Sequence, residues 1–233
     1  MTTIEGAIAL VTGGQRGLGR ALAQEFLNRG ASKVYVTARK PEASDDPRVV
    51  PFELEVTDPD SIAAARERAG DVSIVVNNAG VLRPGPLLRT EMADVVETFE
   101  TNVFGPLRIA RAFAPVLAAN GGGALVDMHS ALSWSSGAAA YGASKAALWS
   151  ITNSLRIELA EQGTQVVGVH LGFADTDMVK AIAVPKIGPA EVAAAVADGL
   201  EQGASEVLVD EFTRQVKAAL SGPVEGLALP FAR

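Results

Sequence analysis

Short apolar runs alternate with longer stretches of helical periodicity along the chain. The first run, Ala7–Val11, is followed by Leu18–Asn28, in which apolar residues recur at intervals of three and four. Uninterrupted apolar runs of strand length are typical of parallel strands covered on both faces, because such strands have no solvent-facing side. The alternation therefore predicts β-α-β units and a parallel sheet with helices on both faces.

The same pattern continues to the C-terminal part of the chain. Further runs rich in Val, Ile and Leu have strand length, namely Val34–Thr37, Val49–Leu54, Val72–Val76, Ala124–Met128, Val166–Leu171 and Glu206–Val209. Further helices are predicted at Ser61–Ala69, Met92–Ala119, Ala139–Glu161 and Pro189–Gln202. No repeat, low-complexity tract or Pro/Gly/Ser-rich linker divides the chain. We therefore expect one Rossmann-type, doubly wound α/β domain, residues 1–233, with a parallel sheet of about seven strands.

The composition narrows the class of protein. The 233 residues are 48% hydrophobic, which is ample for a buried core. The absence of cysteine excludes disulfides and thiolate metal sites, and the net charge of −7 comes without a basic cluster for nucleic acid. No run approaches the roughly 18 apolar residues of a membrane span. We expect a cytoplasmic protein with no nucleic-acid partner and no membrane partner.

A glycine-rich turn joins the first predicted strand to the first predicted helix. It reads Thr12-Gly13-Gly14-Gln15-Arg16-Gly17-Leu18-Gly19. Glycines at such a junction let the backbone approach a pyrophosphate, whose charge then meets amide groups at the helix N-terminus. An ordinary tight turn also uses glycine, and the spacing differs from the common Gly-x-Gly-x-x-Gly pattern. The position between strand and helix favours a dinucleotide-binding turn.

Tyr141 and Lys145 are a candidate acid catalyst. Residues four apart on a helix lie on one face, so the predicted helix brings the phenol and the ammonium group together. A nearby positive charge lowers the pKa of a phenol, and a phenol tuned toward neutral pH can protonate a developing alkoxide. The alternative is a half-buried aromatic residue beside a solvated lysine, so the pair needs support from other residues.

Five blocks occur in an order that resembles the classical short-chain dehydrogenase/reductase family over essentially the whole chain. They are the turn Thr12–Gly19, Asn77-Asn78-Ala79-Gly80, Asn102, Ser130, and Tyr141 with Lys145. The resemblance implies a carbonyl reductase in which Tyr141 protonates the substrate oxygen and Ser130 orients the carbonyl. It also implies that Lys145 lowers the pKa of the phenol and binds the nicotinamide ribose, and that Asn102 holds a water for proton replacement.

Charge at the end of the second predicted strand indicates the cofactor. An NAD-selective site usually has a carboxylate there for the ribose hydroxyls, whereas a 2′-phosphate needs cations. Ala38 stands at this place, Arg39 follows it, and Arg16 lies in the glycine turn. Two guanidinium groups can bind one phosphate, so we expect NADPH to be preferred over NADH. The alternative is that both arginines are ordinary surface residues.

The resemblance implies further cofactor contacts. Glu55 and Val56 would flank the adenine, Asn78-Ala79-Gly80 would support the adenosine ribose, and Thr176 would hold the nicotinamide carboxamide. The full implied cofactor set is Gly13, Gln15, Arg16, Gly17, Leu18, Gly19, Arg39, Glu55, Val56, Asn78, Ala79, Gly80, Tyr141, Lys145 and Thr176. Two positions depart from the commoner pattern. Glu55 stands where Asp or Asn is more frequent, and Leu171-Gly172 replaces Pro-Gly, which is expected to loosen the nicotinamide loop.

The segment 173–188 falls where the family has its variable substrate lid, and it is short. Together with the neighbouring apolar residues it predicts an open pocket for a ketone or aldehyde that has a hydrophobic substituent. These residues are Val81, Leu82, Leu132, Trp134 and Met178. Trp134 has an equal alternative, which is packing in the core or at a subunit contact. Ser130 precedes Tyr141 by eleven residues, fewer than is usual in the family, so we expect a tightened loop beside the pocket.

Family members commonly assemble through two long helices, here Met92–Ala119 and Ala139–Glu161, so a homotetramer or homodimer is expected. The tail 222–233 contains two prolines and is expected to lie against a neighbour. His129 and His170 are too few for a metal cluster, so we expect no metal site. The alternatives for function are an NADP⁺-dependent alcohol dehydrogenase working in the oxidative direction and an NADP(H)-binding regulator without turnover.

Overall fold

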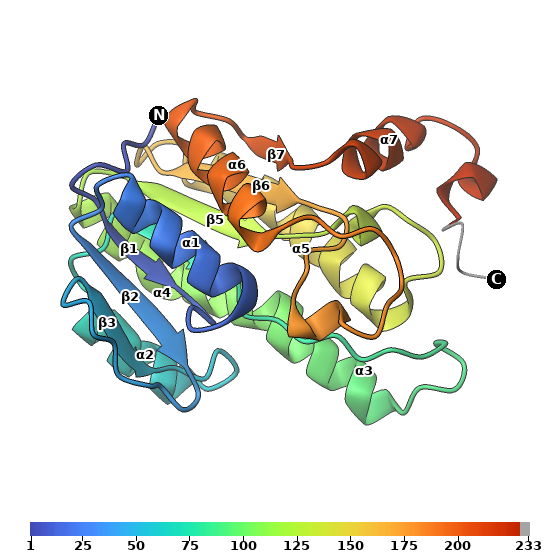
Figure 1. Cartoon of the computed structure of the whole chain (residues 1–233), viewed down its shortest axis with the longest axis horizontal. Coiled ribbons are helices and arrows are strands. Elements are labelled where there is room, and N and C mark those ends of the chain that lie inside the picture. Colours follow the sequence, from blue (N-terminus) through green and yellow to red (C-terminus); the bar gives the residue numbers. More distant parts are fainter. Residues whose placement is uncertain (229–233) are drawn as a thin grey trace.

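The apolar runs form one parallel sheet in the computed structural model, which describes residues 1–228 (Figure 1). Its strands are β1 (Ile8–Val11), β2 (Lys33–Ala38), β3 (Val49–Glu53), β4 (Ile74–Asn77), β5 (Ala124–Met128), β6 (Gln165–His170) and β7 (Glu206–Leu208). The seven strands have the order β3-β2-β1-β4-β5-β6-β7, and every neighbouring pair is parallel. The order reverses between β1 and β4, which confirms the predicted doubly wound, Rossmann-type fold.

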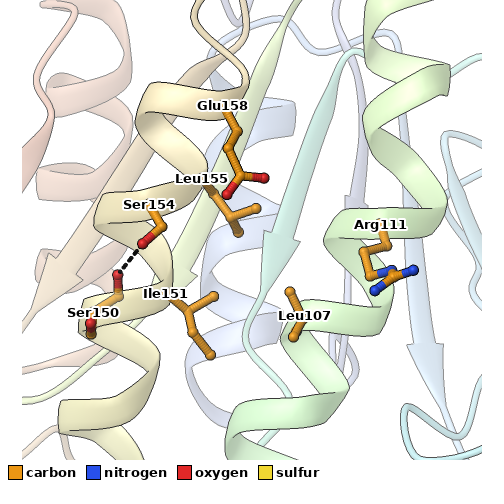
Figure 2. Close-up of a pocket in the computed structure, with 7 residues that line it drawn as sticks. All are labelled: Leu107, Arg111, Ser150, Ile151, Ser154, Leu155 and Glu158. Carbon is orange, nitrogen blue, oxygen red and sulfur yellow. Dashed lines mark hydrogen bonds between the residues drawn. The ribbon is translucent and has the colours of Figure 1, made fainter.

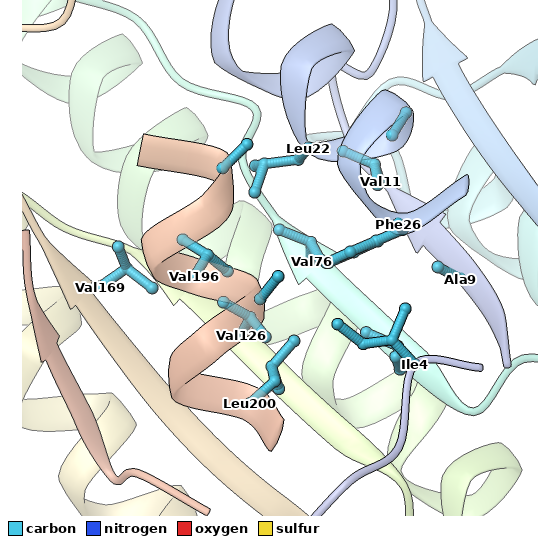
Figure 3. Close-up of a cluster of buried hydrophobic side chains, with 14 of the residues drawn as sticks. Ile4, Ala9, Val11, Leu22, Phe26, Val76, Val126, Val169, Val196 and Leu200 are labelled. Atoms are coloured by element: carbon cyan, nitrogen blue, oxygen red, sulfur yellow. The ribbon is translucent and has the colours of Figure 1, made fainter. Parts of the chain in front are cut away.

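Helices cover both faces of the sheet because alternate strand residues point to opposite sides. On one face lie α1 (Gly17–Asn28) and α6 (Pro189–Glu201), and Figure 3 shows their apolar side chains meeting those of β1, β4 and β5. On the other face lie α2 (Pro59–Arg68), α4 (Gly105–Ala119) and α5 (Ala139–Glu158), which enclose a second buried cluster. In β1, Val11 belongs to the first cluster and Leu10 to the second. The uniformly apolar strands therefore reflect burial on both sides.

The long predicted helix Met92–Ala119 is divided in the structure. It consists of α3 (Met92–Phe99), a π-helical segment at Glu100–Phe104, and α4. In a regular α-helix the amide of residue 106 would donate to the carbonyl of Asn102, but Pro106 has no N–H. The wider π turn at this point is therefore a consequence of the proline, and it places Asn102 on the inner side of the helix, fully buried.

The sequence pattern did not predict α7 (Glu211–Ala219), which follows β7. Thr213 is its buried residue, and the available signal was Asp210, whose side chain caps the N-terminus of the helix. Short 3₁₀ turns occupy Ala131–Ser133, Asp177–Val179 and Val224–Leu227. Part of the predicted tail, residues 229–233, lies outside the described residues. Within residues 1–228, none of the helices combines the length and the apolar character needed to cross a bilayer.

Candidate active site

The predicted blocks meet at the carboxyl edge of the sheet. The glycine turn follows β1, Asn78-Ala79-Gly80 follow β4, and Ser130 follows β5. In open parallel sheets ligands bind at this edge, where the strand order reverses. The fold therefore brings residues that are far apart in the sequence to one place.

The glycine turn has the backbone that an anion site requires. Gly17 has φ +51°, a conformation that side chains other than glycine rarely adopt, and it opens α1. A Cβ atom on Gly19 would lie 2.2 Å from the carbonyl oxygen of Gly13, so only glycine fits there. No side chain caps the N-terminus of α1, and its first turn has no acidic residue. The amide groups at this end are therefore available to a negatively charged group.

Asn78 and Thr12 hold the turn in place. The Asn78 side-chain amide donates to the carbonyl oxygens of Thr12 at 2.9 Å and Gly13 at 3.2 Å. The Thr12 hydroxyl oxygen accepts from the backbone amides of Asn78 and Ala79, both at 3.0 Å, and its proton goes to Val76. Asn78 and Ala79 therefore support the turn itself, and Thr12, which the sequence analysis assigned no role, links them.

The two arginines predicted to select the cofactor are both exposed. Arg39 follows the end of β2, and Arg16 precedes α1. The side chain of Gln15 joins the two regions, since its amide donates to the Glu42 carbonyl at 2.6 Å and its oxygen accepts from the Glu42 amide at 2.9 Å. Gln15 therefore fixes the loop after β2 to the glycine turn that contains Arg16.

Glu55 and Val56 are engaged with the protein. The Glu55 carboxylate accepts from the Thr57 amide at 3.1 Å and the Thr57 hydroxyl at 3.0 Å, and the buried Val56 packs against Gly105. Their place beside the adenine stays a prediction. At the other end of the site, Thr176 reaches the glycine turn, since a Cβ on Gly17 would lie 3.3 Å from its methyl group. The segment 173–188, the predicted substrate lid, thus contacts the turn.

Ser130 and Tyr141 line one cavity of about 330 Å³ beneath the lid. Ser130 is buried, and its hydroxyl oxygen accepts from the Leu132 amide at 3.1 Å while its proton points to the Leu171 carbonyl at 3.4 Å. Burial raises the pKa of Tyr141 to about 12, and a hydrogen bond with Ser130 acts in the opposite direction. Burial and the Ser130 hydroxyl are the two influences on the pKa of Tyr141 in the chain alone, and its lowering by Lys145 stays a prediction.

Lys145 lies behind Tyr141 in the interior. Its ammonium nitrogen is 5.8 Å from the centre of the tyrosine ring and donates to the Met128 carbonyl at 2.7 Å. Burial lowers the pKa of Lys145 to about 8, and the charge of Asp127 acts in the opposite direction. The ammonium group therefore titrates close to neutral pH, unlike a solvated lysine.

Asn102 ties the π-helical segment to the chain after β4. Its side-chain amide donates to the Val81 carbonyl at 2.9 Å and to the Ser144 hydroxyl at 3.1 Å, and its oxygen accepts from the Val81 amide at 2.8 Å. Gly80 lies between Asn102 and Lys145, since its Cβ would be 3.2 Å from the amide oxygen and 4.0 Å from the ammonium nitrogen. Both donors of the Asn102 amide are used, and one lone pair of the oxygen remains.

The cavity is mostly apolar, and three of the predicted pocket residues line it. These are Leu82, Leu132 and Met178. Trp134 does not line the cavity, so its assignment to the substrate pocket is corrected to the alternative of core packing. The Trp134 ring is 5% exposed, stacks on His170 with ring centres 4.0 Å apart, and meets Trp149 edge-on at 5.6 Å.

Comparison with known proteins decides the family. A family model described as short chain dehydrogenase matches residues 7–186. The chain belongs to this family. It is 34% identical over 215 residues to the 3-oxoacyl-(acyl-carrier-protein) reductase FabG of Escherichia coli K12, covering 87% of each protein. Its resemblance to the family, inferred above from five blocks, is thereby confirmed.

Solved structures agree with this assignment. A short chain dehydrogenase from Burkholderia cenocepacia in complex with NADP is 38% identical, with a TM-score of 0.91 and 97% of both chains covered. A short-chain dehydrogenase from Streptomyces avermitilis is 29% identical, with a TM-score of 0.82, covering 93% of this chain and 91% of that one. As a member of this family the protein is an oxidoreductase.

The structure of this short-chain dehydrogenase adds residues that the sequence analysis did not assign. Asp127, near the carboxyl end of β5, accepts hydrogen bonds from Asn77 at 2.8 Å and Thr152 at 2.7 Å. Burial raises its pKa. Its charge acts on Lys145. The available signal was a carboxylate within an otherwise apolar strand, because a buried acid needs partners.

A second hollow of about 460 Å³ lies on the outer surface between α4 and α5 (Figure 2). Leu107 and Ile151 form its apolar floor, and Arg111 and Glu158 stand on its two sides. The catalytic candidates do not contribute to it. It lies on the two helices that were expected to mediate assembly.

Proposed function

We propose that this short-chain dehydrogenase uses NADPH to reduce a ketone or aldehyde to an alcohol, with Tyr141 as the general acid. The observation that carries the proposal is the shared cavity, in which the Ser130 hydroxyl and the Tyr141 phenol face one mostly apolar space of about 330 Å³. A carbonyl oxygen in that space can meet both groups, while a hydrophobic substituent contacts Leu82, Leu132 and Met178.

The residues around the glycine turn fit a dinucleotide phosphate. The uncapped end of α1 offers amide donors, Gly17 and Gly19 leave room for close approach, and no acidic residue opposes a negative charge in the first turn. The exposed Arg16 and Arg39 would bind the 2′-phosphate, and the related Burkholderia enzyme was crystallised with NADP. When bound, NADPH supplies the hydride that adds to the carbonyl carbon.

The side chains of the site deliver a proton to the substrate oxygen and replace it. As the carbonyl double bond opens, the oxygen gains negative charge and takes the proton of the Tyr141 phenol, while Ser130 donates a hydrogen bond to the same oxygen. The ammonium group of Lys145 stabilises the phenolate that remains. A water on the free lone pair of Asn102 would return a proton along this path.

The protonation state of Tyr141 suits a proton donor. A phenol with a pKa of about 12 keeps its proton at neutral pH, so the proposed general acid is present in its protonated form. The similarity to a 3-oxoacyl-(acyl-carrier-protein) reductase supports a 3-oxoacyl thioester as one candidate substrate. The lining of the cavity supports ketones and aldehydes with hydrophobic substituents more generally.

The test is a carbonyl panel that includes 3-oxoacyl thioesters, with consumption of NADPH or NADH as the readout. Tyr141→Phe should lower turnover by on the order of 10²- to 10⁴-fold, because it removes the proton donor, and should leave NADPH binding intact. Ser130→Ala should also lose turnover. Unchanged turnover in Tyr141→Phe would remove the proposed acid, and equal use of NADH would remove the cofactor preference. NADPH binding without turnover of any carbonyl would favour the regulator.

We also propose that the enzyme is cytoplasmic and works as a homodimer or homotetramer assembled through α4 and α5. The groove between the two helices and the exposed Ile157 support this, since an apolar side chain that is 78% exposed on a helix is suited to burial by a second copy.

A further inference from the structure

The carboxylate of Asp210 serves two parts of the molecule at once. One oxygen accepts from the Thr213 amide at 2.7 Å and the Thr213 hydroxyl at 2.8 Å, which is the ordinary N-terminal cap of α7. The other oxygen accepts from the amide of Gly172 at 2.7 Å, across 38 residues of sequence. A cap needs only the first contact, so the second has a separate role.

The peptide group that Asp210 binds is held on its opposite side by the catalytic loop. The amide of Gly172 and the carbonyl of Leu171 belong to one rigid, planar peptide. That carbonyl accepts from the Ala131 amide at 2.8 Å and from the Ser130 hydroxyl at 3.4 Å. The plane of the peptide is therefore fixed between a carboxylate and the catalytic serine.

The charge of Asp210 reaches Ser130 through this peptide. Hydrogen bonds to ionised acceptors are stronger than neutral ones, and bonds in a chain polarise one another. The negative charge at the amide of Gly172 makes the Leu171 carbonyl a better acceptor, which strengthens its 2.8 Å bond from the Ala131 amide and so fixes the backbone beside Ser130. Removing the carboxylate would abolish the bond from the Gly172 amide to Asp210 and would also weaken the bonds that the Leu171 carbonyl accepts.

Little clearance remains around Gly172. A Cβ on this residue would lie 3.1 Å from the ring of Phe212 and 3.2 Å from the Asp210 carboxylate. Gly172 and Phe173 line the cavity, and the lid begins at Phe173. A movement of this peptide would therefore shift the cavity wall and the serine together. The sequence Leu171-Gly172 in place of Pro-Gly was expected to loosen this loop. The hydrogen bond from the Gly172 amide to Asp210 anchors it instead.

We propose that Asp210 is a positioning residue of the reductase site, acting through the Leu171–Gly172 peptide on Ser130 and on the start of the lid. The effect on catalysis rests on the proposed function, whereas the hold on the peptide can be measured without it. Asp210 does not line the cavity, so its effect should fall on turnover more than on NADPH binding.

The test compares D210N and D210S with T213V. Asn and Ser can still cap α7, but neither offers a second anionic oxygen to Gly172. Thr213→Val removes the hydroxyl contact to Asp210 and keeps the Gly172 contact, so it is the matched control. The readouts are kcat and KM on the best carbonyl of the panel, NADPH binding by fluorescence, and amide hydrogen exchange of a peptide spanning residues 171–176.

For D210N and D210S we expect kcat to fall by on the order of tenfold, the KM for NADPH to stay within about twofold, and exchange at residues 171–176 to accelerate. T213V should resemble the wild type in all three. The proposal would be overturned if both Asp210 variants kept the wild-type kcat, or if hydrogen exchange at residues 171–176 were unchanged in both. It would also be overturned if T213V lost as much kcat as the Asp210 variants. If the wild type reduces no carbonyl, the proposed function fails, and the exchange rates alone then decide whether Asp210 holds the peptide.

Discussion

At the scale of single residues, burial acts on Tyr141 and Lys145 in opposite directions. Desolvation disfavours the charged form of each group, so it raises the pKa of the phenol to about 12 and lowers that of the lysine to about 8. The phenol therefore keeps its proton at neutral pH. The lysine becomes the group whose charge changes within the working range, so the pH dependence of reduction is expected to report Lys145.

We predict that the rate of carbonyl reduction falls as the pH rises through about 8. Below this value Lys145 is charged and stabilises the phenolate that forms when Tyr141 gives up its proton. Above it the positive charge is lost, so kcat should decrease by about tenfold per pH unit. Stopped-flow measurement of NADPH oxidation between pH 6 and 10 checks this, and the residual activity of Lys145→Met should show no such step.

A suitable control for that experiment is Lys33→Met, because Lys33 begins β2 at the opposite edge of the sheet and pairs with Asp71. Its profile should match that of the wild type. A wild-type rate that stays constant through pH 9 would show that the charge of Lys145 does not limit the reaction.

At the scale of elements, the ends of β5 and β6 are held by stacked rings. The ring centres of His129 and His170 are 4.6 Å apart, and the ring of Trp134 stacks on that of His170. Burial lowers the pKa of His170 to about 3, although Glu206 stands 3.7 Å from its ring nitrogen. Burial also lowers the pKa of His129. Both rings are therefore neutral, and the stack requires that they stay so.

We predict that His170 makes the fold sensitive to mild acid. The unfolded chain takes up a proton at this residue below about pH 6.5, and the folded chain does not until about pH 3, so stability is lost as the pH falls. At pH 5 the loss from His170 amounts to about 2 kcal/mol. Urea unfolding of wild type and His170→Phe at pH 7 and pH 5 measures it.

The comparison between the two proteins reports His170 and its influence on the neighbouring His129, because the oppositely shifted Asp127 is present in both. Phenylalanine keeps a ring of similar shape in the stack. The free energy of unfolding should therefore decrease less in His170→Phe than in the wild type. An equal decrease would mean that His170 is protonated in the folded protein or contributes nothing.

The elements differ in how far the sequence predicts them. The strands were predictable because burial on both faces leaves a continuous apolar run, and the glycine turn because its position between strand and helix is informative. The π-helical segment was not predicted, although Pro106 carries the signal, and α7 was missed although Asp210 stands at its N-cap. The inward turn of Trp134 depends on contacts with His170 and Trp149, which no local pattern contains.

The residues of the candidate site also differ in how far the sequence predicts them. Ser130, Tyr141 and Lys145 were found from spacing and order, since each stands at the end of a strand or on one helix. Asp210 was not found, because its role depends on an oxygen that reaches Gly172 from a different part of the chain. Long-range contacts of this kind arise from the sheet order, in which β7 lies beside β6.

At the scale of the whole molecule, the two hollows lie on different parts of the surface. The cavity beneath the lid contains the catalytic candidates, and the groove between α4 and α5 contains none of them. The groove combines the apolar Leu107 and Ile151 with Arg111 and Glu158 on opposite sides (Figure 2). A surface that carries both charges offers each charge an opposite partner on a second copy, as a twofold contact between identical chains requires.

We predict that Ile157→Arg dissociates the proposed homodimer or homotetramer into chains of 24.1 kDa. Ile157 is 78% exposed on α5 and lies one helical turn from Ser154, which lines the groove, so a second copy would bury it. A guanidinium group in its place would be buried without a partner, at a cost of several kcal/mol. Leu88→Arg is the control, since Leu88 is 100% exposed in the loop before α3. Sedimentation velocity should show the wild type and Leu88→Arg assembled and Ile157→Arg monomeric, whereas a monomeric wild type or an assembled Ile157→Arg would exclude this contact.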